Sequence, residues 1–296
     1  MMSVTEKSEL FWDFKGCVDT VDNWPLMSSP FPMLTFTASY LLFVLKYGRV
    51  YMKNREPYSL KNVIVLYNIL QVIASAYLVY LAMTLSWPHG WVAKTCLLEK
   101  EDTRDKLTVV LYYYFLAKMS EVFDTIFFVL RKKYNQVSFL HVYHHTLMIV
   151  TSWIFLKYEP IYPSLFIRNI NSFVHIIMYT YYALASFPSL RKYLWWKKYI
   201  TTLQLVQFVL VFIHFALTYA ISECTPSFLL GLTVFGNSSF FVYLFGQFYW
   251  KTYKNRENKK YIKKENENSN NETYYLKNNN NINTTNARRK NIMKAR

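Results

Sequence analysis

The sequence HVYHH at 141–145 contains three histidines within five residues. His141, His144 and His145 are spaced i, i+3 and i+4, which places them on one face of a helix. Apolar residues surround them, so the cluster lies in a segment suited to lipid. Imidazoles in this pattern can bind a metal ion, perform nucleophilic or acid–base chemistry on a lipid-soluble substrate, or fill a core.

Further polar side chains occur in the neighbouring apolar segments. KMSEVFDT at 118–125 places its ionisable residues on one helical face, and its lysine and glutamate are spaced to form an ion pair. NSFVHIIMYTYY at 171–182 and TTLQLVQF at 201–208 add a histidine, amides and tyrosines. Such groups are costly in a bilayer and usually have a function or a partner. The candidates are Lys118, Glu121, Asp124, Asn171, His175, Tyr179 and Gln204.

Two kinds of chemistry compete for the histidines. Four imidazoles, His141, His144, His145 and His175, could bind one zinc ion. A membrane di-iron centre needs more histidines than the six present, and we expect His89 and His214 to lie away from the cluster. We therefore favour nucleophilic or acid–base use without a cofactor, because an acyl-imidazole survives where water is scarce.

Composition indicates a membrane protein that is all α-helical. Hydrophobic residues make up 53% of the 296 residues, and they form runs near the roughly 20 residues that span a bilayer. The net charge of +16 needs no nucleic acid, because it follows from basic loops and a basic tail. We predict seven membrane-spanning helices at roughly 32–47, 62–86, 107–130, 139–157, 162–186, 199–222 and 227–250.

Basic residues gather in the loops at 46–61, 131–133 and 191–198, which predicts that these loops and the C-terminus are cytosolic and the N-terminus is lumenal. Cys96 and Cys224 then fall in two loops on the oxidising side, where a disulfide and free thiols are equally plausible. We divide the chain into a lumenal segment at 1–31, a transmembrane domain at 32–250 and a disordered Asn/Lys-rich tail at 251–296.

These motifs, in their order and spacing, resemble the fatty acid elongase (ELO) family over roughly residues 30–255. The resemblance implies seven helices around a narrow acyl tunnel in the endoplasmic reticulum membrane. It implies condensation of long-chain acyl-CoA with malonyl-CoA to 3-oxoacyl-CoA, CO2 and CoA. The reductases and dehydratase of later steps would be partners, and homo-oligomers are possible.

Carried onto this sequence, the resemblance makes His144 the nucleophile that takes the acyl group and His175 its partner, with His141 and His145 completing the histidine box. The polar candidates named above would line the site. Arg131, Lys132 and Lys133 would meet the CoA phosphates at its mouth. Two alternatives stay open, a membrane di-iron desaturase or hydroxylase and a non-catalytic seven-helix lipid receptor or carrier.

Overall fold

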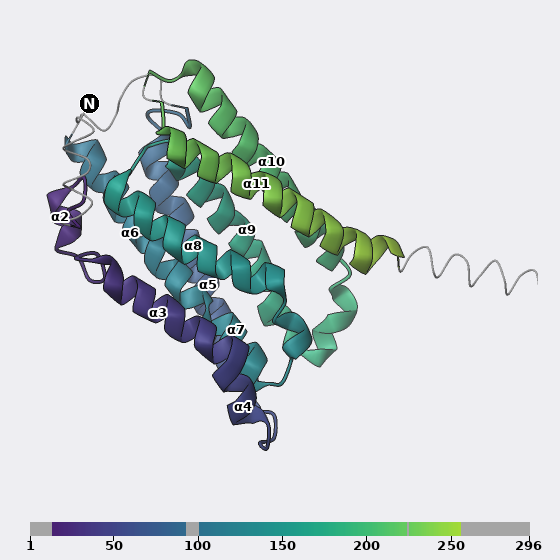
Figure 1. Cartoon of the computed structure of the whole chain (residues 1–296). Coiled ribbons are helices and arrows are strands. Elements are labelled where there is room, and N and C mark those ends of the chain that lie inside the picture. The colour runs from purple at the N-terminus through teal and green to yellow at the C-terminus, as the bar shows by residue number, and fades with distance from the viewer. Residues whose placement is uncertain (1–13, 93–100, 224, 256–296) are drawn as a thin grey trace, which may run out of the picture. The chain divides into compact units, whose positions relative to one another are not determined.

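The computed structural model describes residues 14–92, 101–223 and 225–255, and these ranges are helical without any β-strand (Figure 1). The α-helices are α2 (Asp19–Asp22), α3 (Pro30–Leu42), α4 (Gly48–Met52), α5 (Lys61–Ser86), α6 (Glu101–Glu121), α7 (Phe123–Leu130), α8 (Phe139–Tyr158), α9 (Ser164–Ala185), α10 (Lys197–Ile221) and α11 (Phe228–Tyr249). Short π-helices follow α3 at Phe43–Tyr47 and α11 at Trp250–Lys254, and 3-10 turns occupy Tyr134–Gln136 and Pro188–Tyr193.

Four of the helical segments are long and apolar enough to cross a membrane: Lys61–Ser86, Phe139–Tyr158, Lys197–Ile221 and Phe228–Lys254. The expected all-helical membrane character is therefore confirmed. The other predicted spans fall on α3, on α6 with α7, and on α9. The sequence of α6 begins with charged residues and α9 carries amide and ionisable residues, which lowers their hydropathy. The count of seven spans stays a prediction.

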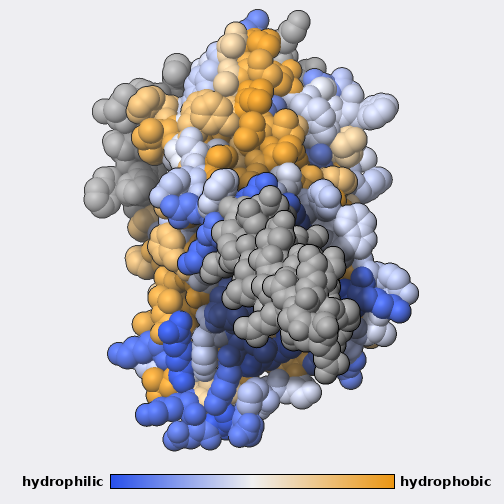
Figure 2. Space-filling model, turned by 90° about the vertical axis from the view of Figure 1, so that its right-hand side faces the viewer, coloured by the Kyte–Doolittle hydropathy of each residue, from blue (hydrophilic) through white to orange (hydrophobic). Residues whose placement is uncertain are grey.

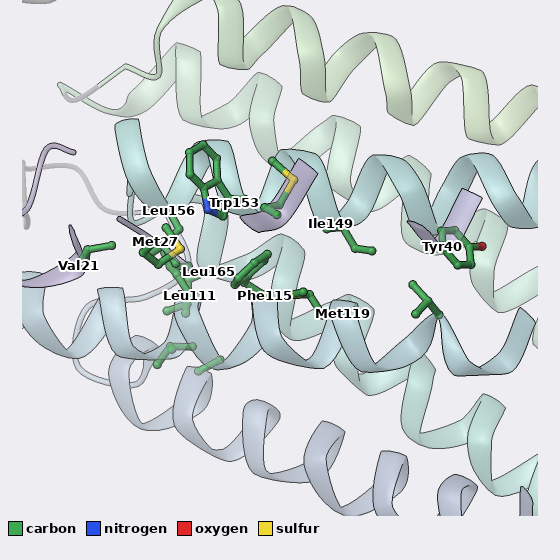
Figure 3. Packing of buried hydrophobic residues seen from close by; sticks show 14 of the residues in the cluster. Val21, Met27, Tyr40, Leu111, Phe115, Met119, Ile149, Trp153, Leu156 and Leu165 are labelled. Carbon is green, nitrogen blue, oxygen red and sulfur yellow. The ribbon is translucent and has the colours of Figure 1, made fainter. Parts of the chain in front are cut away.

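α8 packs against α6 and α3, and α9 packs against α5, α6 and α10. The buried side chains Ile149, Trp153 and Leu156 of α8 lie with Leu111 and Phe115 of α6 in one apolar core (Figure 3). This core stabilises the fold by removing large apolar surfaces from solvent and by close packing. It therefore fixes the rotation of α8, and with it the directions of the histidines.

The end of the bundle at which α4 and α7 finish carries the cations Lys53, Arg55, Arg131, Lys132 and Lys133, and we call it the basic end. Two segments distant in sequence meet there, because the backbone N–H of Tyr58 donates to the carbonyl of Leu130 (3.1 Å) and Lys132 Nζ donates to the carbonyl of Lys53 (3.4 Å). Hydrophilic residues gather on the lower part of the face in Figure 2, where α4 and its following loop lie, and apolar residues gather above them.

At the opposite end a buried ion pair joins α8 to the segment before α3. Lys157 Nζ lies 2.6 Å from Asp22 Oδ1 and also donates to the carbonyl of Met27 (2.5 Å). The Lys157 side chain is fully buried. Asp22 in turn accepts from the backbone N–H of Gly16 (2.9 Å). These contacts hold the segment 16–27 against the end of α8.

The chain divides into a compact unit that ends at Phe245 and a second unit that begins at Gly246, of which residues 246–255 are described as the end of α11 and the π-helix. Several sequence expectations lie outside the described residues. They are the tail beyond 255, residues 1–13 of the N-terminal segment, and the Cys96–Cys224 pair.

Candidate active site

The first two turns of α8 carry the histidine cluster. Ser138 precedes the helix in extended conformation and its Oγ accepts from the backbone N–H of His141 (3.3 Å), as an N-cap does. The ring centroids of His141 and His145 are 4.4 Å apart, and those of His144 and His145 are 5.5 Å apart. The structure therefore keeps the three imidazoles together, as the spacing predicts.

The three rings do not face the same neighbours. His141 Nε2 lies 2.9 Å from Thr125 Oγ1 of α7, and Thr125 Oγ1 lies 3.1 Å from the hydroxyl of Tyr40 on α3. His144 turns toward α11, where its ring centroid is 5.2 Å from that of Phe241. His141 is thus held in a hydrogen-bonded chain between helices, whereas His144 has an aromatic neighbour.

His144 lines a narrow cavity of about 100 Å³ enclosed mainly by α8, α9, α10 and α11. His144 and Phe155 both line it, and their separation of 11 positions corresponds to about 16 Å along the helix. Most of the wall is apolar, with Phe208, Phe215 and Phe241 among its residues. An elongated space with an imidazole in its wall suits the chain of a lipid better than a compact polar ligand.

His175 belongs to a buried charged group beside this cavity. Lys118 Nζ donates to Glu121 Oε1 (2.7 Å), and the ion pair expected from their spacing is confirmed. His175 Nδ1 lies 3.0 Å from the same Glu121 oxygen, although the angle is outside that of a hydrogen bond. All three side chains are less than a tenth exposed. Asn171, one turn from His175 along α9, lines the cavity.

Two further polar pairs connect α9 to α6 and α7. The hydroxyl of Tyr179 donates to Asp124 Oδ2 (2.8 Å), and the hydroxyl of Tyr114 donates to Asn171 Oδ1 (2.9 Å). Tyr114 and Asn171 line the cavity, whereas Asp124 and Tyr179 do not. The hydrogen bond between Tyr179 and Asp124 therefore connects α9 to α7 without forming part of the cavity wall.

The remaining predicted residues lie away from the cavity wall. Gln204 Nε2 points to Met178 Sδ (3.7 Å), and Gln207 of the same helix lines the cavity instead. Arg131, Lys132 and Lys133 lie at the basic end in the turn that follows α7, with Lys133 exposed and the other two half-buried. The expected charged surface is present at one end of the bundle, and its contact with a CoA stays a prediction.

The polar residues of the cavity wall that the sequence did not single out include Tyr114, Arg168 and Asn237. Arg168 had a recognisable signal, because it is an ionisable residue inside a predicted span and precedes Asn171 by three positions on one helical face. Asn237 accepts a hydrogen bond from the hydroxyl of Tyr143 (3.1 Å), which required knowledge of how α8 and α11 pack.

The two histidines outside the cluster are placed elsewhere, as expected. His214 Nε2 lies 3.1 Å from the carbonyl oxygen of Pro163, and its ring stacks on Phe166 at 4.2 Å. His89 packs edge-to-face against Tyr162 (6.3 Å). Within the ranges that the structure describes, no three His, Cys, Asp or Glu side chains converge to form a metal site.

Comparison with known proteins gives consistent matches over most of the chain. The GNS1/SUR4 family (ELO) matches residues 25–261. Very long chain fatty acid elongase 2 of Mus musculus is 42% identical over 248 residues, which cover 83% of this chain and 84% of the relative. Elongase 7 of Drosophila melanogaster is 38% identical over 261 residues, covering 84% and 79%. Elongase 4 of Homo sapiens is 38% identical over 252 residues, covering 84% and 80%. The motifs, the helical architecture and these matches agree, and the chain belongs to the GNS1/SUR4 (ELO) family.

Proposed function

We propose that this protein elongates fatty acids by condensing a long-chain acyl-CoA with malonyl-CoA, giving a 3-oxoacyl-CoA, CO2 and CoA. The observation that supports this most directly is the position of His144 in the wall of a narrow, mainly apolar cavity. Such a cavity matches an acyl chain in shape and polarity, and the imidazole supplies a nucleophile beside it. The names of the family relatives, very long chain fatty acid elongases, support the same reaction class.

In the first step, His144 attacks the thioester carbonyl of the acyl-CoA. The carbon–sulfur bond breaks, an N-acyl-imidazole forms, and the imidazole proton is transferred to the departing CoA thiolate. The acyl chain then occupies the cavity between α8 and α11. The apolar wall limits access of water, which protects the acyl-imidazole from hydrolysis.

In the second step, malonyl-CoA loses CO2 and its remaining electron pair forms an enolate. The enolate carbon attacks the acyl carbon, a carbon–carbon bond forms, and the carbon–nitrogen bond to His144 breaks. The released imidazole regains a proton. The sum consumes one proton per turn, with no oxidant or reductant, and we propose that no cofactor is required.

His175 is the candidate for moving these protons. Glu121 lies 3.0 Å from His175 Nδ1 and would stabilise the imidazolium that forms when His175 accepts a proton. Lys118 is fixed to the same carboxylate oxygen and keeps it ionised and oriented. The unaligned angle between His175 and Glu121 suits a contact that tightens once substrate is present.

The wider setting of the proposal follows from charge and topology. We propose seven spans in the endoplasmic reticulum membrane, with the basic end cytosolic and the N-terminus lumenal. Arg131, Lys132 and Lys133 would then attract the CoA phosphates from the cytosol. The reductases and dehydratase that process the 3-oxoacyl product would be partners on the same side.

The decisive assay incubates purified protein with acyl-CoA and malonyl-CoA labelled in the carboxyl carbon. We expect labelled CO2 and a 3-oxoacyl-CoA, formed at the same rate in the presence of a metal chelator. Oxygen consumption that depends on iron and a reductant would instead identify a desaturase or hydroxylase. Saturable lipid binding without turnover would identify a receptor or carrier.

The nucleophile is tested by mass spectrometry of intact protein and of its peptides after exposure to acyl-CoA alone. We expect an adduct of one acyl group on His144, and we expect His144→Ala to lose both the adduct and the product while remaining folded. His89→Ala is the matched control, because His89 does not line the cavity, and it should keep full activity. An adduct on another histidine, or activity in His144→Ala, would refute the assignment.

A further inference from the structure

Arg168 places a charged side chain in the wall of the apolar cavity. It lies in the second turn of α9, is only 6% exposed, and lines the cavity together with His144 and Asn171. Arg168 precedes His175 by seven positions, which corresponds to about 10 Å along the helix. Arg168 therefore lies about two helical turns from the histidine that is proposed to move protons, nearer the start of α9.

The contacts of Arg168 leave part of its hydrogen-bonding capacity unused. One terminal nitrogen, Nη1, donates to the carbonyl of Ser164 (3.0 Å), and Cζ lies 5.4 Å from the centre of the Tyr114 ring. The Nε–H has no acceptor, and among the described residues no carboxylate lies within 4 Å of the side chain. A buried donor without a partner is costly, and a membrane-embedded cation is usually functional.

The opposite wall offers acceptors but few donors. On α8, Thr151 donates its hydroxyl proton to the carbonyl of Leu147 (2.8 Å), and Ser152 donates to that of Met148 (2.5 Å). Both residues line the same cavity as Arg168. Their oxygens can therefore accept a hydrogen bond from a ligand, while Arg168 can donate one. A ligand hydroxyl can fill both roles at once.

We propose that Arg168 is a specificity-determining residue that favours acyl chains bearing a hydroxyl group in their distal part. The proposal rests on the proposed elongase function and specifies its substrate class. A plain hydrocarbon chain displaces water from the cavity and leaves the Nε–H of Arg168 without an acceptor. A hydroxyl at the depth of Arg168 accepts from Nε–H and donates to an oxygen of Thr151 or Ser152. The discrimination thus arises from an unsatisfied buried donor.

The test compares acyl-CoAs of equal chain length, one plain and the others with a hydroxyl at successive carbons of the distal half. Binding to the full-length protein in detergent is measured by competition, without malonyl-CoA, so that no turnover is needed. We expect a hydroxyl at one narrow range of positions to bind about tenfold more tightly than the plain chain, as one hydrogen bond to a charged donor allows.

Arg168→Met should lose this positional preference and bind the plain chain more tightly than wild type does. Val234→Ala is the matched control, because Val234 lines the same cavity on α11 and its side chain has no hydrogen-bonding group; it should keep the preference. Arg168→Leu also removes every donor of the side chain but has a different shape, so it should likewise lose the preference, and it serves if the methionine variant does not fold.

Equal preference in wild type and in the Arg168 variants would overturn the proposal, as would the absence of any preferred hydroxyl position. Tighter binding of a chain ending in a carboxylate, lost in the same variants, would assign the site to anions and overturn the hydroxyl assignment. The turnover assay is read separately. Failure to release CO2 with every acyl-CoA refutes elongation. If turnover is intact but the order of affinities for the acyl-CoAs is the same in wild type and in the Arg168 variants, only the role of Arg168 is refuted.

Discussion

Replacing Glu121 by glutamine removes the negative charge between two basic side chains inside the bundle. Glu121 Oε1 lies 2.7 Å from Lys118 Nζ and 3.0 Å from His175 Nδ1. The side chains of Lys118 and Glu121 are 2% and 3% exposed, so water cannot take the place of the carboxylate. The variant therefore leaves a buried ammonium group without its counter-ion.

The magnitude follows from this geometry. With an effective dielectric constant of about 20, two charges at this separation attract by about 6 kcal/mol. Desolvation of both groups offsets part of that attraction, and breaking a buried ion pair from one side typically costs about 3–5 kcal/mol. At about 2–4 °C per kcal/mol for a protein of this size, Glu121→Gln should lower the melting temperature by about 6 °C or more.

The assay is thermal denaturation of the detergent-solubilised protein, combined with product formation at a temperature where each variant is folded. The double variant Lys118→Met with Glu121→Gln removes both charges and should recover most of the lost stability. It should not recover activity, because His175 still lacks the carboxylate. Equal melting temperatures for wild type and Glu121→Gln would refute the buried-pair argument. Recovery of activity in the double variant would refute the role given to Glu121 beside His175.

Two further predictions address the two ends of the bundle. Lys132→Glu combined with Lys133→Glu should raise the KM for acyl-CoA more than it lowers kcat, since both cations are placed to attract phosphates, and steady-state kinetics at two salt concentrations would detect it. An unchanged KM would move the CoA site elsewhere. Asp22→Asn should reduce stability by about 2 kcal/mol, because Lys157 is fully buried and loses a charged hydrogen-bond partner. The exposed Asp19→Asn should change the melting temperature little; equal effects of the two substitutions would contradict the assignment.

Local spacing predicted the contacts that form within one helix. Lys118 and Glu121 are three residues apart, and a helix brings such side chains together whatever surrounds it. The same rule placed His141, His144 and His145 next to one another. The hydrophobic runs predicted helices at the observed places, although α3 begins at Pro30 and α6 at Glu101, before the ranges expected for those spans.

The spacing of residues within one helix does not predict which side chains of different helices contact one another. His141 and His144 differ by only about 60° around the helix axis. That angle is enough for one to meet Thr125 of α7 and the other to face the cavity beside Phe241, because different helices pack on the two sides of α8. Gln204 and Gln207 are related by the same spacing, and the rotation of α10 decides that Gln207 reaches the cavity.

The sequence by itself determined which residues are able to do the chemistry and that they belong to apolar helices, because residue type and helical period are local properties. Only the tertiary structure decided that His144 lines the cavity, that Glu121 is shared by Lys118 and His175, and that Arg168 lies in the cavity wall. The physical reason is that packing of the bulky side chains fixes how each helix is rotated against its neighbours. That rotation depends on all the helices in contact and is not encoded in the spacing within any one of them.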